Sequence, residues 1–388
     1  MANNYLPTTV FEEAIKRTNF IFDNCDDVIV AMSGGKDSTV VFNLALMVAK
    51  ERNRLPLKVM WLDQEAEWQA TDDYMSYIMH RKDVKPYWFQ IPFDFTNSLS
   101  FEDNFLRVWD ETKKDIWIRP QNDISIKVNP TKENRFHKIL NMLPSYCDVE
   151  DKKHVAVLSG MRISESLNRR MTLGYAKAKY KGITWCRKPI NNTRVFYPIY
   201  DFTDTDVWAA IAKNKWKYNR IYDSFYRYGI TGTNMRVSAL IHETSWQSIE
   251  RLQECEPQIY NRYLDRVHGT SCFSHFGKEI IPKELPQVFK DWKEYRDYLL
   301  KAFVKPEYWE LFQNRWKNQN SEYWYKNHVS EIMVNDIDGT LNKNTDSRVR
   351  GKAKIENGFY TNRFANRIKN GVYAENPNKG DENEKTSS

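Results

Sequence analysis

Long apolar runs are absent from this chain of 388 residues. A transmembrane helix needs about 20 consecutive, mostly apolar residues, and the sequence contains no such run. Residues 1–20 also lack the continuous apolar core of a signal peptide. We therefore expect no membrane span and no secretion signal, and we expect a cytoplasmic protein.

Cysteine is scarce, with 5 residues in the whole chain. Their number is odd and no two form a C-x-x-C pair, which argues against a disulfide framework, a four-cysteine zinc site and an iron–sulfur cluster. Cys255, His268, Cys272 and His275 lie close together in sequence, but their spacing is irregular. A metal site there is an alternative that we do not favour, and we expect no metal-ligating cluster.

Charge and aromatic content favour anionic ligands without identifying one. The net charge is +7, and 14% of the residues are aromatic. A positive balance suits nucleotides or nucleic acid, and aromatic rings can fill a core or stack on bases. The basic residues are dense near the end of the chain, at Lys343, Arg348, Arg350, Lys352, Lys354, Arg363, Arg367 and Lys369.

Strand and helix patterns alternate along the first half of the chain. Short apolar runs predict strands at 28–32, 57–62, 87–91, 154–158 and 196–199. Amphipathic spacing predicts helices at 8–22, 38–50 and 67–81. Strands separated by helices imply right-handed crossovers, so we predict an α/β fold with a mostly parallel sheet and flanking helices.

The same patterns divide the chain into three regions. We predict a nucleotide-binding α/β domain over residues 1–215, with an aromatic, partly helical insertion at about 93–150. Residues 216–335 have a helical pattern rich in Trp and Tyr. Residues 336–388 are predicted to be a basic, flexible tail that could contact nucleic acid or a protein partner.

The stretch VIVAMSGGKDST, residues 28–39, joins the first predicted strand to the next helix. Ligands of parallel sheets bind at such strand ends. Glycines allow a tight turn and a close approach, and the amides at a helix N-terminus favour phosphate. Asp37 could cap the helix or hold a magnesium ion already bound to phosphates. We predict a phosphate-binding loop made of Ser33, Gly34, Gly35, Lys36, Asp37 and Ser38.

Other nucleotide and metal motifs do not fit. The loop is not G-x-x-x-x-G-K-S/T, because Val30 stands where the leading glycine would be, and it is not G-x-G-x-x-G. IHETSW begins like the zinc-protease motif H-E-x-x-H, but Trp246 occupies the position of the second histidine.

SGGKDS resembles the PP-loop motif of the N-type ATP pyrophosphatases. Within that superfamily the chain is similar to the phosphoadenosine phosphosulfate (PAPS) reductase family over about residues 25–270. WLDQEAEWQAT resembles the family element D-x-x-x-E-F/W-x-x-T and matches it at Asp63, Glu67, Trp68 and Thr71. The resemblance implies that this strand end borders the adenosine.

SGMRISESLNR resembles the family element G-x-R-x-x-E-S-x-x-R, matching at Gly160, Arg162, Glu165, Ser166 and Arg169. Two arginines seven positions apart can share a helix face, and their guanidinium groups could clamp a phosphate or sulfate. YPIYDFTDTDVWAAI resembles P-I-x-D-W-x-x-x-D-V-W, with Phe in place of the first Trp, and we expect it to be structural.

The resemblance implies a Rossmann-like adenine nucleotide alpha hydrolase fold and cleavage of ATP between its α- and β-phosphates. Pyrophosphate would leave and the adenylyl group would pass to an acceptor that the sequence does not identify. Lys36, Asp37 and Arg162 would be catalytic, with Mg²⁺. Asp63, Gly160, Arg162 and Arg169 would join the loop in binding ATP or PAPS.

Two other functions stay open. The family's E-C-G-x-H motif, which carries the redox cysteine, is missing, and HGTSCFSHFG with Cys272 is the nearest candidate for a sulfonucleotide reductase or sulfotransferase-like enzyme. The long aromatic middle and basic tail are similar to the IbrA-like branch, described as coactivators of prophage gene expression. That resemblance implies a nucleotide-sensing regulator.

Overall fold

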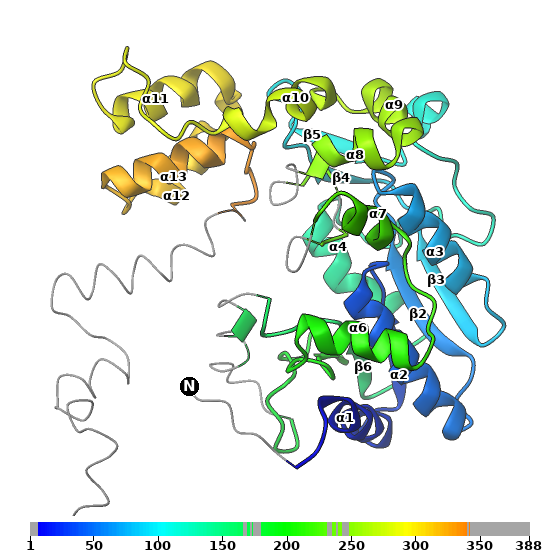
Figure 1. Ribbon diagram of the computed structural model, residues 1–388. Coiled ribbons are helices and arrows are strands. Elements are labelled where there is room, and N and C mark those ends of the chain that lie inside the picture. The colour runs from blue at the N-terminus through cyan, green and yellow to red at the C-terminus, as the bar shows by residue number, and fades with distance from the viewer. Residues whose placement is uncertain are drawn as a thin grey trace, which may run out of the picture. The chain divides into compact units, whose positions relative to one another are not determined.

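Five parallel strands form the central sheet, in the order β3-β2-β1-β6-β7 (Figure 1). Their bounds are β1 Asp27–Ala31, β2 Leu57–Leu62, β3 Val84–Phe89, β6 Val155–Leu158 and β7 Thr193–Phe196. β2 and β3 lie on one side of β1, and β6 and β7 lie on its other side. The strand order therefore reverses between β1 and β6, which is where open parallel sheets bind ligands.

This computed structural model describes residues 7–165, 169–170, 173, 180–230, 235–237, 240–242, 248–339 and 341. The described residues as far as Ile337 belong to one compact unit. None of the helices in this part of the chain is long and apolar enough to cross a bilayer. The predicted tail lies almost entirely outside the described residues, and the predicted boundaries at 215 and 335 stay predictions.

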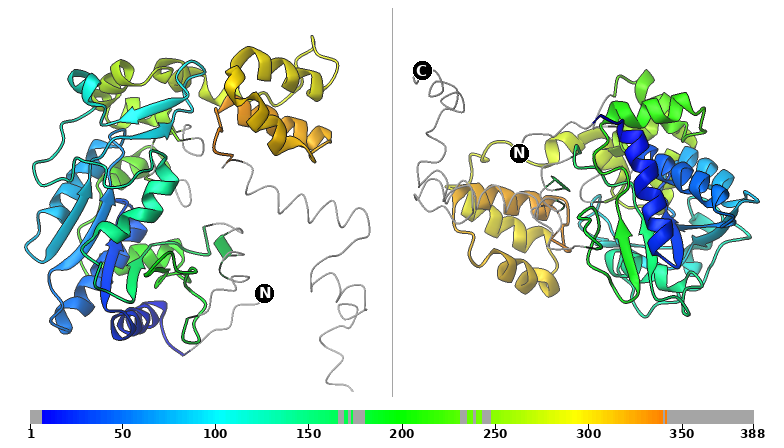
Figure 2. Two further views of the ribbon diagram at one scale, coloured as in Figure 1. Left: turned by 180° about the vertical axis from the view of Figure 1, so that it is seen from behind. Right: turned by 90° about the horizontal axis from the view of Figure 1, so that it is seen from below.

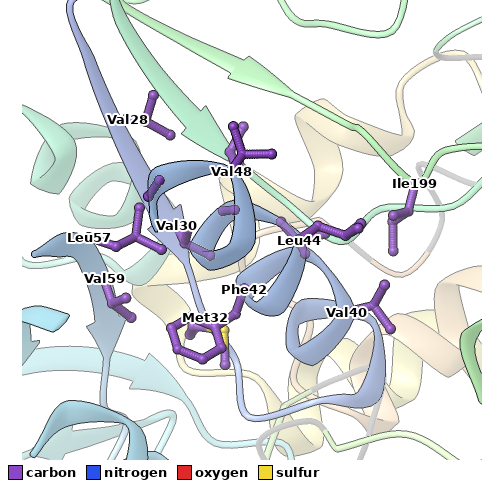
Figure 3. Packing of buried hydrophobic residues seen from close by; sticks show 14 of the residues in the cluster. Val28, Val30, Met32, Val40, Phe42, Leu44, Val48, Leu57, Val59 and Ile199 are labelled. Carbon is purple, nitrogen blue, oxygen red and sulfur yellow. The ribbon is translucent and has the colours of Figure 1, made fainter. Parts of the chain in front are cut away.

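The central strand β1 is buried on both faces, as its unbroken apolar run predicts. Val30 packs into the main apolar core with Leu44 and Val48 of α2 (Lys36–Glu51) (Figure 3). Ile29 is equally buried but is not part of that cluster, because neighbouring side chains of a strand point to opposite faces.

Helices flank the sheet. α1 (Val10–Asn24) packs against α2, α2 also packs against α6 (Asp204–Lys213), and α3 (Gln69–Met79) packs against β3. Thr9 and Thr203 form capping boxes at the starts of α1 and α6. The predicted α/β fold, a mostly parallel sheet with flanking helices, is confirmed.

Two local features differ from the sequence prediction. The segment predicted at 196–199 forms its strand earlier, since β7 ends at Phe196 and Pro198 has no N–H to donate to a strand ladder. The insertion between β3 and β6 contains an antiparallel hairpin of β4 (Phe93–Thr96) and β5 (Phe105–Val108). Short helices follow the hairpin: η1 Glu111–Ile116, α4 Phe136–Met142 and η2 Leu143–Tyr146.

The predicted helical C-terminal region is present. It comprises α7 Ile221–Arg227, α8 Ile249–Cys255, α9 Pro257–Arg266, α10 Thr270–Ile280, α11 Trp292–Phe303, α12 Pro306–Trp316 and α13 Glu322–Met333. α11 and α13 pack side by side (Figure 2). Together with α12 they enclose a second apolar core that includes Leu299, Phe312 and Ile332, so their aromatic residues are used mainly for packing.

Candidate functional site

The glycine-rich loop follows β1 at its carboxyl end. Gly34 has a φ of +70°, and a Cβ atom there would lie 2.7 Å from the Cγ2 atom of Thr71. Both facts require glycine, because other residues disfavour this conformation and would clash. Gly35 is the N-cap of α2 and gives the helix no side-chain cap, so the loop leads directly into a helix N-terminus.

The two serines fold the loop onto itself. The Ser38 hydroxyl donates to the carbonyl oxygen of Gly35 at 2.9 Å and accepts from the Ser33 amide at 3.4 Å. The Ser33 and Ser38 hydroxyl oxygens are 3.3 Å apart. These contacts hold the turn in a fixed shape at the start of α2.

Lys36 is only 3% exposed, although it is the first residue of α2. Its Nζ atom donates to the carbonyl oxygen of Met235 at 3.1 Å and lies 3.2 Å from Oδ1 of Asp204. Its backbone amide donates to the Tyr222 hydroxyl at 2.9 Å. A buried ammonium group is thus held in place by residues far away in the sequence.

Arg162 joins the same cluster from the loop after β6. Its Nε atom lies 2.5 Å from Oδ1 of Asp37, and a terminal nitrogen lies 3.4 Å from Oδ1 of Asp204. Burial raises the pKa of Asp37, and the positive charges of Arg162 and Lys36 only partly oppose this. Two cations and two carboxylates therefore meet beside the glycine-rich loop.

Gly160 allows the loop after β6 to touch the phosphate-loop candidate. A Cβ atom at Gly160 would lie 2.8 Å from the carbonyl carbon of Asp37 and 2.8 Å from the amide nitrogen of Ser38. Both are backbone atoms, which cannot rotate away. A side chain at this position would push the two loops apart.

These loops line a cavity of about 700 Å³, a size typical of small-molecule sites. The predicted site residues in its wall are Ser33, Gly35, Lys36, Asp37, Ser38, Gly160, Arg162 and Arg169. The cavity extends past the ends of four neighbouring strands, from Trp61 and Leu62 of β2 to Val195 of β7. The structure therefore brings together most residues that the motifs identified.

Arg169 lines the cavity and forms an ion pair with Glu165. Glu165 in turn lies 3.7 Å from the Nε atom of Arg162. Arg162 itself is in a loop rather than on a helix, so the two arginines face one cavity without sharing a helix face. Ser166 lies outside the described residues.

Asp63 does not line the cavity. Its side chain is fully buried and accepts hydrogen bonds from Trp88 Nε1 at 2.9 Å and Gln90 Nε2 at 2.8 Å. It also forms an ion pair with the buried Arg119. The structure thus places Asp63 in a polar network behind the end of β2.

Glu67 lines the cavity and was not among the residues expected to bind ligand, although the matched family element contains it. It is 5% exposed, and burial together with the charge of Asp63 raises its pKa to about 8. Asp204, Tyr222 and Met235 were also missed. No local motif could have revealed these three, because each reaches Lys36 through tertiary structure.

Cys272 is exposed on α10 and is absent from the wall of this cavity. Among the described residues, no group of three or more His, Cys, Asp or Glu side chains is arranged to hold a metal ion. The cavity near Lys36, where most of the motif residues meet, is therefore taken as the candidate site.

The chain is similar to two curated proteins and to several solved structures. The protein is 24% identical over 355 residues to the uncharacterized protein YbdN of Escherichia coli K12, covering 84% of this chain and 82% of YbdN. It is 26% identical over 270 residues to the uncharacterized protein MJ0973 of Methanocaldococcus jannaschii, covering 68% of this chain and only 54% of that relative.

Among solved structures, the chain matches PAPS reductase from Candida auris in a phosphate complex, with a TM-score of 0.31 and 13% identity over 56% of this chain and 85% of that one. FMN adenylyltransferase from Candida glabrata with FMN and AMPCPP has a TM-score of 0.34 and 12% identity over 57% of this chain and 64% of that one. The family model of the phosphoadenosine phosphosulfate reductase domain matches residues 27–229, more than half of the sequence. The chain belongs to the phosphoadenosine phosphosulfate reductase domain family.

Proposed function

We propose that this protein binds an adenine nucleotide in the cavity beside Lys36 and cleaves ATP between the α- and β-phosphates. The observation that carries the proposal is the convergence of a glycine-rich loop, a helix N-terminus and two buried cations, Lys36 and Arg162, on one cavity. Loop amides and the helix dipole favour phosphate, and the two cations offset charge that develops on the leaving pyrophosphate.

The reaction is a displacement at the α-phosphorus of ATP. A nucleophilic atom of the acceptor forms a bond to this phosphorus while the bond to the bridging oxygen breaks. The electron pair leaves with pyrophosphate, and the proton of the acceptor passes to solvent. In this scheme the loop and Lys36 hold the β- and γ-phosphates, so that the α-phosphate is presented to the rest of the cavity.

The residues fit a magnesium ion that arrives with the nucleotide. Asp37 lies at the start of α2 and in the cavity wall, and its carboxylate is held by an ion pair with Arg162. Asp37 and Asp204 would supply the carboxylate oxygens that Mg²⁺ prefers. The ion would neutralise phosphate charge and orient the leaving pyrophosphate, while Arg162 holds both carboxylates in place.

Asp63 has a supporting role in this proposal. It orders the end of β2 through Trp88, Gln90 and Arg119 rather than contacting the nucleotide. The apolar side chains of Trp61 and Leu62, which line the cavity next to it, then form the wall for the adenosine.

Isothermal titration calorimetry with ATP, AMPCPP and PAPS, each with Mg²⁺, tests the proposal. Lys36→Ala is expected to weaken ATP binding by roughly 10- to 100-fold, the effect of losing a hydrogen bond to a charged group. Lys50→Ala is the matched control, because Lys50 is exposed on the same helix and is absent from the cavity wall. Unchanged ATP affinity in Lys36→Ala would contradict the proposal.

Turnover is tested by pyrophosphate release from ATP in the presence of metabolite and nucleic-acid acceptors. AMPCPP should bind and block release, because its α–β bridge cannot be cleaved in this way. No release with any acceptor, despite tight ATP binding, would favour a nucleotide-binding protein without this reaction.

Membership of the family favours a second candidate, reduction of a sulfonucleotide, for which Cys272 would be the thiol. Its exposed position outside the cavity wall argues against that role. We predict that Cys272→Ser leaves nucleotide affinity and any sulfite release from PAPS unchanged. Sulfite release that disappears in Cys272→Ser would establish the reductase instead.

The regulator of the IbrA type is a third alternative, which depends on the basic tail. Removing residues 336–388 should then abolish any affinity for DNA, measured at low salt because phosphate contacts weaken as salt rises. Retained DNA affinity would exclude the tail from such a role.

A further inference from the structure

The cavity continues beyond the glycine-rich loop to the outermost strand of the sheet. β7 is separated from β1 by β6, so this corner is two strands away from the phosphate-loop candidate. The cavity-lining residues from the segment that includes β7 are Arg187, Lys188, Ile190, Thr193, Val195 and Tyr197. We call Arg187, Lys188 and Tyr197 the β7 corner.

Tyr197 is a buried polar side chain that opens into the cavity. It is 5% exposed and lines the wall, and its hydroxyl makes no hydrogen bond with any described residue. Burial raises the pKa of Tyr197, and the positive charges of Arg187 and Arg169 partly oppose this. Tyr197 thus shares the cavity wall with Arg187 and Arg169, and its hydroxyl has a donor available for a ligand.

The charge of the β7 corner is not balanced by acids. The acidic residues in the cavity wall are Asp37, Glu67, Glu165 and Asp204. Asp37, Asp204 and Glu165 pair with Lys36, Arg162 or Arg169, and Glu67 belongs to the opposite end, after β2. Arg187 and Lys188 are exposed and have no acidic partner among the described residues, which leaves a positive field at this corner.

We propose that the β7 corner binds an anionic group, phosphate or carboxylate, of the acceptor that receives the adenylyl group. The inference rests on the proposed function, because the phosphates of ATP occupy the glycine-rich loop and leave this corner to a second molecule. A guanidinium fork matches both kinds of oxyanion, a lysine adds a point charge, and the tyrosine hydroxyl donates one more hydrogen bond. The acceptor is thus an anion whose nucleophilic group faces the α-phosphate.

The test is calorimetric titration of inorganic phosphate, at low ionic strength, into protein saturated with AMPCPP and Mg²⁺. Wild type is expected to bind phosphate in addition to AMPCPP. The double variant Arg187→Ala, Lys188→Ala should weaken phosphate by roughly tenfold or more, and Tyr197→Phe by about 2- to 10-fold, the range for one neutral hydrogen bond. The control Lys50→Ala, Lys213→Ala removes the same charge from exposed helix positions outside the cavity wall and should change affinity less than about twofold.

Two results would overturn the inference: neither phosphate nor acetate binds once AMPCPP is bound, or the bound anion binds the Arg187, Lys188 double variant as well as wild type. Acetate, titrated in a parallel experiment, tells a carboxylate site from a phosphate site. Binding of either anion that depends on the β7 corner supports the inference, and binding of neither overturns it.

Failure of the proposed function gives a different result. If AMPCPP does not bind, the same phosphate titration is made on the protein alone and compared with Lys36→Ala. Phosphate affinity that depends on Arg187 and Lys188 but not on Lys36 keeps the β7 corner as an anion site while the ATP reaction is abandoned. Affinity that depends only on Lys36 assigns the anion to the glycine-rich loop and overturns the β7 corner.

Discussion

Replacing Glu67 by Gln tests whether this carboxyl is protonated in the folded protein. Burial, with Asp63 and Asp72 nearby, raises the pKa of Glu67 from 4.5 to about 8, and Arg119 only partly opposes the shift. Between these values the folded state holds a proton that the unfolded state has lost. The folded state then binds more protons, so the free energy of unfolding falls as the pH rises from about 4.5 to about 8.

The size of the effect follows from the shift. One pKa unit corresponds to about 1.4 kcal/mol, so about 2.5 units between the two limits cost roughly 3 kcal/mol at pH 7. The cost is about 4 kcal/mol at pH 8, where half of the folded molecules have lost the proton, and it levels off at about 5 kcal/mol above that pH. Gln has nearly the same shape as protonated Glu but cannot ionise, so Glu67→Gln removes this cost.

The measurement is urea unfolding of both proteins, without nucleotide, at several pH values from 5 to 8. Glu67→Gln and wild type should have similar stability at pH 5, and the variant should become progressively more stable towards pH 8. Glu51→Gln, at an exposed position at the end of α2, should follow wild type throughout. A difference between Glu67→Gln and wild type that is constant over this range, or that has the opposite sign, would refute the reasoning.

Two further substitutions test the packing around the site. Gly160→Ala would place a Cβ atom 2.8 Å from backbone atoms of Asp37 and Ser38. We therefore expect the free energy of unfolding to fall by about 1–3 kcal/mol and ATP binding to be lost in calorimetry. A variant that binds ATP as tightly as wild type would contradict this close contact. Arg266 holds Glu65 through nitrogen–oxygen distances of 2.6 and 2.9 Å, with both side chains buried. Arg266→Ala should cost about 3–5 kcal/mol in urea unfolding because it leaves a buried carboxylate without its partner, and Glu65→Gln in the same chain should recover part of this loss.

The sheet could be predicted because each of its strands contains a short apolar run that is visible in the sequence itself. β2 coincides with the predicted run at 57–62, and β1 differs by one residue at each end, since continuous apolar segments flanked by polar residues can only be buried strands here. The hairpin of β4 and β5 was missed for the opposite reason. Each of its strands is only 4 residues long, and their pairing depends on contacts across the insertion rather than on a local pattern.

The candidate site likewise contains residues that a local motif identifies and residues that only the tertiary structure reveals. Ser33 to Ser38 could be predicted because a glycine-rich turn and a helix start are contiguous in the sequence. Asp63 shows the limit of motif reasoning, since the matched element correctly marks the strand end but cannot tell whether the carboxylate faces the cavity or the polar network behind it. Glu67, four positions later, is the carboxylate that the structure places in the cavity wall.

The long-range contacts of Lys36 have a consequence for ligand binding. Its amide already donates to the Tyr222 hydroxyl, and its Nζ atom donates to Met235 and contacts Asp204. A phosphate that uses these donors must exchange with protein acceptors, so the measured affinity for ATP is the difference between two sets of contacts. Asp204 sits near the start of α6, and Tyr222 belongs to α7. Occupation of the loop by phosphate therefore alters contacts with both helices, and the nucleotide site extends well beyond the motif that first indicates it.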